Sequence, residues 1–318
     1  MRNIDVFNGD ADGLCSLRQL RLAEPVDSQL VTGPKRDISL LERVDAGPGD
    51  SVTVLDVSLE RNRAALLRLL ERGARVLYFD HHFAGEVPVH ASLEAVLDTS
   101  RDICTSVLVD RYLKGRFRVW AVVGAFGDNL DAVALELGAS LALGADELEK
   151  LRELGRSLNY NAYGESESDL LIPPAQLYAR LAKYKDPLQF VAKEKLFARL
   201  RAAMHADLKA AMEVSPRWSG ERASAYLLPD RPASRRVLGV FANHLAGIDP
   251  RRAHAVLAPK TKGGYIVSVR VPAGTRTSAE AFCRQLPTGG GRGGAAGIDD
   301  LPEVRMEEFL ERFAATFA

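Results

Sequence analysis

The sequence predicts an α/β protein: a doubly wound parallel sheet, then a helical linker, then a second, smaller mixed α/β domain. Apolar runs suited to buried strands alternate with amphipathic segments in the first part of the chain. Helical spacing dominates from about residue 148 to residue 212, and a mixed pattern follows from about residue 219. We therefore expect a first domain over 1–190, a linker over 191–220 and a second domain over 221–318.

The first domain is predicted from its apolar runs and from the helical spacing between them. The expected strands cover residues 3–8, 29–32, 52–55, 76–79, 95–97 (an edge strand) and 119–126 (a central strand). The expected helices cover residues 14–23, 38–44, 59–72 and 105–114, and another begins at about residue 130. Because strands alternate with helices, right-handed crossovers and a parallel sheet should follow.

A polar segment over 157–174 interrupts the helical region that comes next. Its part Asn159–Gly164 contains two tyrosines and two asparagines. Two interpretations are open: a loop that lines a nucleobase pocket with stacking faces, or a solvated loop packed by its own tyrosines.

The second domain is predicted to be a mixture of short strands and helices. The expected strands cover residues 222–228, 237–240 and 265–271, and the expected helices cover 250–257, 278–286 and 307–315. A long glycine-rich loop is expected over 289–297.

Composition narrows the classes of function. The formal net charge is zero, with 42 basic and 42 acidic residues, which argues against capture of long duplex nucleic acid but allows a local basic pocket. Three scattered cysteines, Cys15, Cys104 and Cys283, fit a reducing compartment. The N-terminal residues lack a signal-peptide core, and no apolar stretch is long enough to span a bilayer. We expect a cytoplasmic protein without membrane contacts.

Acidic residues and histidines follow four of the apolar runs. They are Asp10 and Asp12, Asp56, Asp80-His81-His82, and Asp128. Taken alone, Asp80-His81-His82 would more simply cap the next element or pair with backbone. Ligands of an open parallel sheet gather outside the carboxyl ends of its strands, so the whole set should meet there. Carboxylates this close repel one another, and a divalent metal ion supplies the compensating charge.

These motifs, in this order and spacing, resemble the DHH phosphoesterase superfamily. The segment Asp10-Ala11-Asp12-Gly13, the acidic and histidine residues after it, and the glycine-rich loop all take part. The C-terminal part is similar to the DHH-associated domain of the RecJ and nanoRNase (oligoribonuclease) branch, and the resemblance covers the whole chain. It implies hydrolysis of a phosphodiester or related bond with a pair of Mn²⁺ ions, or Mg²⁺ in their place.

The resemblance also implies a role for each metal ligand. Asp10 would hold one ion and Asp12 the other, Asp56 would bridge them, and His81 and Asp128 would complete the second site. Two ions held in this way clamp the attacking and leaving oxygens of a phosphoryl group. Oxygen and imidazole ligands without thiolates suit manganese.

Two further positions near the metals have implied roles, and one position departs from the family. Asp80 would orient an imidazole or bind water, and His82 would contact the scissile phosphate, so that Asp80, His81 and His82 are the expected catalytic residues. Many members carry a histidine where this chain has Val6. Asn8 is a candidate to support the first metal instead.

The second domain is implied to hold the substrate's far end. The nanoRNase loop usually reads Gly-Gly-Gly-His, and here Arg292 replaces the histidine. Arg292, Arg270 and the amides of Gly290, Gly291 and Gly293 are the expected substrate-binding groups, and a permanent charge favours a terminal phosphate such as that of linear pGpG. The alternative for the loop is a close-packed turn.

Three functional hypotheses follow. The leading one is a manganese-dependent phosphodiesterase that cuts short single-stranded oligonucleotides, chiefly di- or trinucleotides, to mononucleotides, with a cleft between domains limiting substrate length. The second is a hydrolase of another small phosphorylated substrate, such as a cyclic dinucleotide or a 3′-phosphonucleotide. The third is a catalytically weak, nucleotide-binding regulator. Members of the family often dimerise, so a homodimer is one possibility, and the sequence leaves the oligomeric state open.

Overall fold

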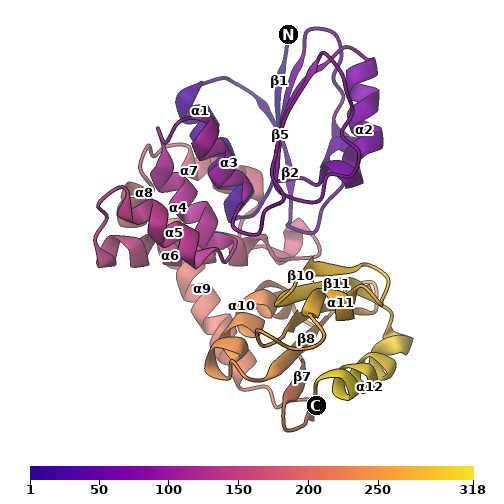
Figure 1. The fold of residues 1–318 in the computed structure, drawn as a ribbon. Coiled ribbons are helices and arrows are strands. Elements are labelled where there is room, and N and C mark those ends of the chain that lie inside the picture. The colour runs from indigo at the N-terminus through magenta and orange to yellow at the C-terminus, as the bar shows by residue number, and fades with distance from the viewer. The chain divides into compact units, whose positions relative to one another are not determined.

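The computed structural model describes the backbone of all 318 residues and every side chain except that of Arg292. The chain forms two compact units (Figure 1). The first comprises Met1–Ala162 and Leu170–Arg201, and the second comprises Tyr163–Asp169 and Ala202–Ala318. Helix α9 (Lys195–Met212) carries the chain from the first unit into the second. Among the helices that the structure describes, none is long and apolar enough to cross a membrane.

A five-stranded parallel sheet organises the first unit, as predicted. Its strands are β1 (Asn3–Asn8), β2 (Gln29–Gly33), β3 (Ser51–Leu55), β4 (Arg75–Asp80) and β5 (Leu93–Leu97), in the order β2-β1-β3-β4-β5. All neighbouring pairs are parallel. β5 lies at an edge, where it was expected.

Helices cover both faces of this sheet, which confirms the doubly wound architecture. Alternate residues of each strand point to opposite faces: Val6 packs into one buried cluster, and Phe7 into the other. On one face lie α2 (Leu59–Glu71) and a 3-10 turn, Leu40–Arg43, which replaces the helix expected over 38–44. On the other lie α1 (Ala11–Ala23) and α3 (Thr105–Tyr112) (Figure 1).

The central strand predicted over 119–126 is wrong. The segment forms helix α4 (Arg118–Gly127), which packs against α1, α3, α5 (Asp131–Ala139) and α6 (Ala145–Ala162). Every residue from Trp120 to Gly127 is buried. A helix that is surrounded on all sides has no polar stripe, so its sequence reads like that of a strand buried on both faces.

The loop predicted over 157–174 is also corrected in part. Residues up to Ala162 continue α6, Tyr160 is fully buried, and the Asn161 side chain bonds the backbone of Leu171 and Ile172. Tyr160 is therefore not available as a stacking face. A 3-10 turn, Glu167–Asp169, follows, and the later helices are α7 (Pro174–Leu181) and α8 (Pro187–Lys193).

The second unit contains a mixed sheet of six strands. They are β6 (Trp218–Ser219), β7 (Ala223–Leu227), β8 (Ala253–Pro259), β9 (Tyr265–Arg270), β10 (Gly289–Arg292) and β11 (Ala295–Leu301), in the order β10-β11-β9-β8-β7-β6. Helices α11 (Ala279–Cys283) and α12 (Met306–Phe317) pack on one apolar cluster of this sheet. A 3-10 turn, Glu303–Arg305, precedes α12.

Three predictions for the second unit are wrong. Residues 237–240, expected to form a strand, lie inside helix α10 (Pro232–Ile248). Residues 250–257, expected to form a helix, include most of strand β8. Residues 289–297, expected to form a loop, form the β10–β11 hairpin. Short apolar runs do not distinguish helix from strand. β8 lies between β7 and β9, so its side chains are buried on both faces and show no alternation.

Candidate metal centre

The Asp80-His81-His82 segment lies at the carboxyl end of β4. Asp80 is fully buried; its Oδ2 accepts a hydrogen bond from Leu59 N at 3.3 Å, and its Oδ1 lies 2.7 Å from His82 Nδ1. The His82 side chain is 45% exposed, and this contact leaves Nε2 as the nitrogen that can act on a ligand. Asp80 therefore orients His82, as buried carboxylates orient imidazoles at metal sites.

His81 is held in one orientation by the backbone. Its Nδ1 lies 3.0 Å from the carbonyl oxygen of Ile103, which can only accept, so Nδ1 carries the hydrogen. Its Nε2 lies 3.3 Å from Asp56 Oδ1. A neutral imidazole would turn a lone pair towards a carboxylate oxygen at this distance, so either a proton or a metal ion must lie between the two atoms.

Asp56 occupies a sharp turn directly after β3. Its φ of 58° is left-handed, a conformation that Asp and Asn tolerate better than most residues. Its backbone N–H donates to Phe79 O at 3.0 Å, and its Oδ1 accepts from Thr105 Oγ1 at 3.2 Å. The turn thus directs the carboxylate of Asp56 towards β4 and the start of α3.

Asp56, His81 and His82 meet the requirements of a divalent cation. One ligand atom from each lies within 4.8 Å of the others. A carboxylate oxygen and imidazole nitrogens, with no thiolate, suit Mn²⁺ and related ions. The contact between His81 Nε2 and Asp56 Oδ1, which requires a proton or a cation between the two atoms, is the feature of this structure that fits a bound metal ion.

Asp12, in the first turn of α1, contacts the N-terminal end of α3. Its two carboxylate oxygens accept hydrogen bonds from the backbone amides of Thr105 at 2.7 Å and Ser106 at 2.8 Å. A helix N-terminus favours a negative charge because its amides and dipole point at the anion. This contact joins α1 to α3 and fixes the first motif beside Asp56.

Asp10 caps α1 and contacts a lysine that the motifs do not include. Its Oδ1 accepts from Asp12 N at 3.0 Å and from Gly13 N at 3.1 Å, and its Oδ2 contacts Lys35 Nζ. Asn8 Oδ1 accepts from Asp10 N at 3.2 Å, so the amide of Asn8 supports the turn. The side-chain oxygen of Asn8 is therefore directed at the backbone of Asp10.

Asp128 reaches this centre from the C-terminal end of α4. Its Oδ1 lies 3.9 Å from Lys35 Nζ. Two glycines allow α4 to approach so closely: a Cβ on Gly124 would lie 2.2 Å from Ser106 Oγ, and one on Gly127 would lie 2.3 Å from Ala11 Cβ. The carboxylate predicted at a strand end is therefore supplied by a helix end.

The crowding of carboxylates in this centre shifts the pKa values of its members. Burial, and then the charges of Asp10 and Asp12, raise the pKa of Asp56 well above its usual value. Burial opposes the charged form of His81, but its hydrogen bond to Asp56 and the charges of Asp128 and Asp56 outweigh this and raise the pKa of His81 to about 10. Burial likewise opposes ionisation of Asp10, but Lys35 lowers its pKa overall.

All the residues predicted to bind metal or act in catalysis in the first domain lie in this one region. They are Asp10, Asp12, Asp56, Asp80, His81, His82 and Asp128, with Asn8 beside them. Lys35, Thr105 and Ser106 also belong to it and were missed. Thr105 and Ser106 begin a predicted helix, and the free amides of a helix start are a feature that the sequence could have indicated. Nothing in the sequence indicated that Lys35 lies here.

The substrate-binding residues predicted for the second domain lie in the second unit. Arg270 ends β9; its Nε donates to Asn243 Oδ1 at 2.7 Å and its Nη1 to Ser268 Oγ at 3.0 Å. In the sheet register, Ala295 pairs with both Arg270 and Arg292, so the backbones of the two arginines flank β11 at one level. The side chain of Arg292 lies outside the described residues.

The glycines of the β10–β11 hairpin serve two purposes. A Cβ on Gly291, whose φ is 144°, would lie 2.4 Å from Ala296 Cα, so this position needs glycine for close packing. A Cβ on Gly290 or on Gly293 would meet nothing within 4 Å. The packing alternative therefore holds at Gly291, whereas the backbones at Gly290 and Gly293 are open.

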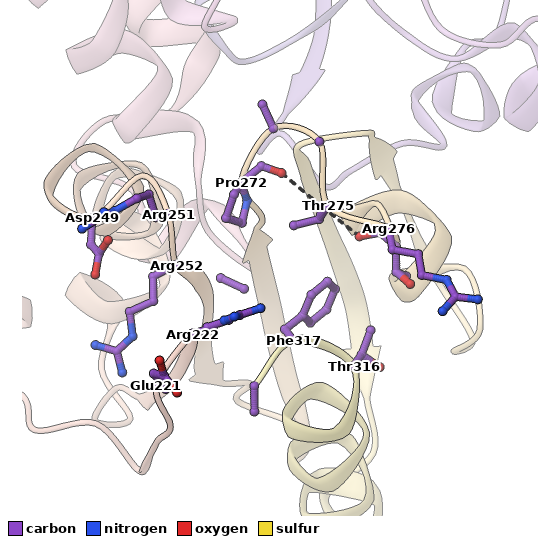
Figure 2. A pocket seen from close by; sticks show the side chains of 15 residues that line it. Glu221, Arg222, Asp249, Arg251, Arg252, Pro272, Thr275, Arg276, Thr316 and Phe317 are labelled. Carbon is purple, nitrogen blue, oxygen red and sulfur yellow. Dashed lines mark hydrogen bonds between the residues drawn. The ribbon is translucent and has the colours of Figure 1, made fainter.

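A separate pocket of about 710 Å³ also lies in the second unit (Figure 2). Arginines line it together with Glu221, Asp249 and the end of α12. Figure 2 shows Arg222 reaching across the middle of the pocket, whereas Arg252 and Arg276 lie on opposite sides and point apart. These guanidinium groups do not converge, so the pocket does not form a compact phosphate site.

Comparison with known proteins rests on solved structures, because no family model and no curated protein sequence matches the chain. The exonuclease RecJ bound to manganese superposes with a TM-score of 0.62 at 20% identity, over 99% of this chain and 89% of RecJ. RecJ from Thermus thermophilus in complex with Mn²⁺ gives 0.62 at 19% identity over 99% of this chain, which spans only 51% of that one. PggH, a pGpG-specific phosphodiesterase from Vibrio cholerae, gives 0.53 at 14% identity, over 99% and 100% of the two chains.

Likeness at these identities establishes a shared fold. Both units are included, because each superposition covers 99% of this chain. The motifs that suggested the resemblance lie at the ends of β1, β3, β4 and α4. The chain therefore has the two-unit α/β fold of RecJ and PggH.

Proposed function

We propose that this chain is a metal-dependent phosphodiesterase that hydrolyses short single-stranded oligonucleotides, chiefly di- and trinucleotides, to mononucleotides. The observation that carries the proposal is the convergence of Asp56, His81 and His82 at the carboxyl edge of a parallel sheet, with Asp10, Asp12 and Asp128 around them. The shared fold adds support, since its solved examples include an exonuclease with bound manganese and a pGpG-specific phosphodiesterase.

A divalent ion held by Asp56 and His81 would lower the pKa of a bound water and stabilise negative charge on a phosphoryl oxygen. Other residues of the chain hold these two ligands in position and supply a proton to the substrate. Thr105 and the Ile103 carbonyl hold the two ligands in place. His82 is oriented by Asp80 and partly exposed, so that in its imidazolium form Nε2 can donate a hydrogen bond to the phosphate or a proton to the leaving oxygen.

Manganese is the proposed ion, with Mg²⁺ as the alternative. Arg270, Arg292 and the open backbone at Gly290 and Gly293 are proposed to bind the substrate's far phosphate. The zero net charge fits a substrate with few phosphates better than a long duplex. A linear dinucleotide with a terminal phosphate, such as pGpG, is the substrate that these features favour.

A time course on 5′-labelled RNAs of two to seven nucleotides, including pGpG, tests this function. We expect rapid loss of the dinucleotides with Mn²⁺ and none with His81→Ala. His90→Ala, which changes an exposed histidine of the same unit outside the metal group, should cleave like the wild type. Stepwise shortening of the longest RNAs would instead indicate a RecJ-like exonuclease. Binding without cleavage by any divalent ion would favour the regulator.

A further inference from the structure

Lys35 is built into the metal centre by the backbone around it. It follows β2 by two residues, after Gly33 and Pro34, and its N–H donates to Ala162 O at 2.9 Å. Its carbonyl accepts from Asn8 Nδ2 at 3.4 Å. Fixed on both sides, Lys35 directs its side chain, which is 26% exposed, onto Asp10, which is 2% exposed.

The ammonium group of Lys35 contacts the carboxylate oxygen of Asp10 that a metal ion would need as a ligand. Asp10 Oδ1 already accepts two backbone amides, those of Asp12 and Gly13, and Asp10 Oδ2 contacts the ammonium. The same ammonium lies 3.9 Å from Asp128 Oδ1. Both carboxylates on this side therefore have a cation of the protein's own.

The other side of the centre is different. Among the described residues, the group able to hold a metal consists of Asp56, His81 and His82, and neither Asp10 nor Asp128 belongs to it. The positive charge of Lys35 also repels any dication placed beside Asp10. The Asp10 side thus has the ammonium group of Lys35, whereas on the other side an imidazole nitrogen of His81 and a carboxylate oxygen of Asp56 lie 3.3 Å apart.

We propose that Lys35 is the second cation of this centre: its ammonium group occupies the Asp10 side permanently, and the chain binds one divalent ion, between Asp56 and His81. This inference rests on the proposed function only in giving that ion a catalytic role. It replaces the pair of ions that the family resemblance implies by one ion and one lysine.

Metal stoichiometry of the full chain, measured without substrate, tests the proposal. The protein is stripped with chelator, dialysed against graded MnCl₂, and assayed for bound manganese per chain by elemental analysis, with the electron paramagnetic resonance signal of free Mn²⁺ as a second readout. We expect one ion per chain in the wild type. Lys35→Met, which keeps the length of the side chain and removes its charge, should bind two.

Three further variants control the measurement. Lys35→Arg keeps the charge and should bind one ion, and Lys150→Met changes an exposed lysine of α6 and should also bind one. If Lys35→Met folds poorly because Asp10 is left without a partner, Asp10→Asn/Lys35→Met removes both charges and should fold and bind one. In the Lys35→Met chain, Mn²⁺ should raise the melting temperature more than it does in the wild type.

The outcomes separate this inference from the proposed function. Two ions in the wild type, or one ion in Lys35→Met, would overturn the role of Lys35. One ion in the wild type and two in Lys35→Met, with no cleavage of any oligonucleotide, would leave Lys35 as the second cation and remove the phosphodiesterase. Failure of every variant to bind Mn²⁺ would remove the metal centre and both proposals with it.

Discussion

Each unit contains a buried carboxylate that pairs with a basic side chain, and these two pairs, Asp169–Arg235 and Asp10–Lys35, differ in how completely they are satisfied. In the second unit, Arg235 donates to both oxygens of Asp169 at 3.0 Å, and Glu165 N adds a bond at 2.8 Å. Both side chains are almost fully buried, at 4% and 3% exposed. Charge and hydrogen-bonding capacity are matched, and the pair anchors the segment Tyr163–Asp169 to α10.

The pair Asp10–Lys35 in the first unit lies among further carboxylates. Asp12, Asp56 and Asp128 lie around it, and the pKa of Asp56 is raised by burial and by the charges of Asp10 and Asp12. One lysine does not balance this group. The comparison teaches that a buried ion pair with matched charges supports the fold. A group of carboxylates with too little positive charge favours binding of a cation and indicates a candidate functional site.

Asp56→Asn should produce the largest effect and should separate activity from stability. It removes a proposed metal ligand but keeps a residue that tolerates the left-handed backbone at position 56. We expect kcat/KM to fall by about 10³-fold, several kcal/mol of transition-state stabilisation. Above about pH 10, where His81 is neutral in the folded chain, the melting temperature without metal should rise, because a carboxylate repelled by its neighbours is gone and no charged partner is lost. A lower melting temperature without metal in this pH range would contradict the contrast between the two pairs.

Arg235→Met should act in the opposite sense. It leaves the buried carboxylate of Asp169 unpaired, and we expect the free energy of unfolding of the second unit to fall by about 3–5 kcal/mol. Urea denaturation followed by tryptophan fluorescence of Trp218 measures this. Arg284→Met is the matched control, because Arg284 pairs with Glu280 on an exposed surface, and it should cost about 0–1 kcal/mol. Equal losses in the two variants would refute the structural role of Arg235.

The two regions should also lose stability at opposite ends of the pH scale. The pKa of His81 is raised to about 10 in the metal-free chain, so its contribution is complete below the unfolded value of about 6.5 and is lost as pH rises through 10. Although burial opposes it, Arg235 lowers the pKa of Asp169, so that contribution is present above about 3.9 and is lost as pH falls through the folded value.

Urea midpoints of the metal-free chain across this pH range test the sign of both effects. His81→Gln should flatten the alkaline side, and Asp169→Asn should flatten the acidic side. With saturating Mn²⁺ the His81 contribution should vanish, since the ion replaces the proton at Nε2. An alkaline slope that persists in His81→Gln would assign it to another group.

Thr105→Val should produce the smallest effect. It keeps the size of the side chain but removes the hydroxyl that donates to Asp56 Oδ1 at 3.2 Å. We expect Mn²⁺ affinity to fall by about tenfold, the lower end of the range for groups that hold a metal ligand in place. Calorimetric titration measures it, and Thr105→Ser, which restores the hydroxyl, should recover the affinity. No recovery would mean that packing, not the hydrogen bond, matters at this position.

The sequence by itself determined the sheet of the first unit and the residues at its edge. β1, β3 and β4 are short apolar runs between turn residues. Asp10 lies two residues after β1, Asp56 directly follows β3, and Asp80 is the last residue of β4. Strand and ligand are adjacent in sequence, and parallel strands bring their carboxyl ends to one edge, so local pattern was sufficient to predict the metal centre.

Only the tertiary structure decided the elements that are buried on all sides. α4 and β8 have no exposed face, so their sequences contain no polar positions to reveal a period of 3.6 or of 2. α4 became a helix because its glycines allow close packing on α1 and α6, and β8 became a strand between two others. Asp128 entered the centre by this packing, from a helix end.

The place of the Lys35 side chain was decided entirely by the tertiary structure. Its neighbour Asp10 is 25 residues away in the chain. The backbone that directs it is held by Ala162, which lies in the last part of α6, the part that was predicted as a loop. A lysine after a strand is ordinarily a solvated surface residue, and its charge shows no pattern in a neutral sequence. Whether it faces water or a carboxylate is determined by what packs on either side of its backbone, which no local pattern records.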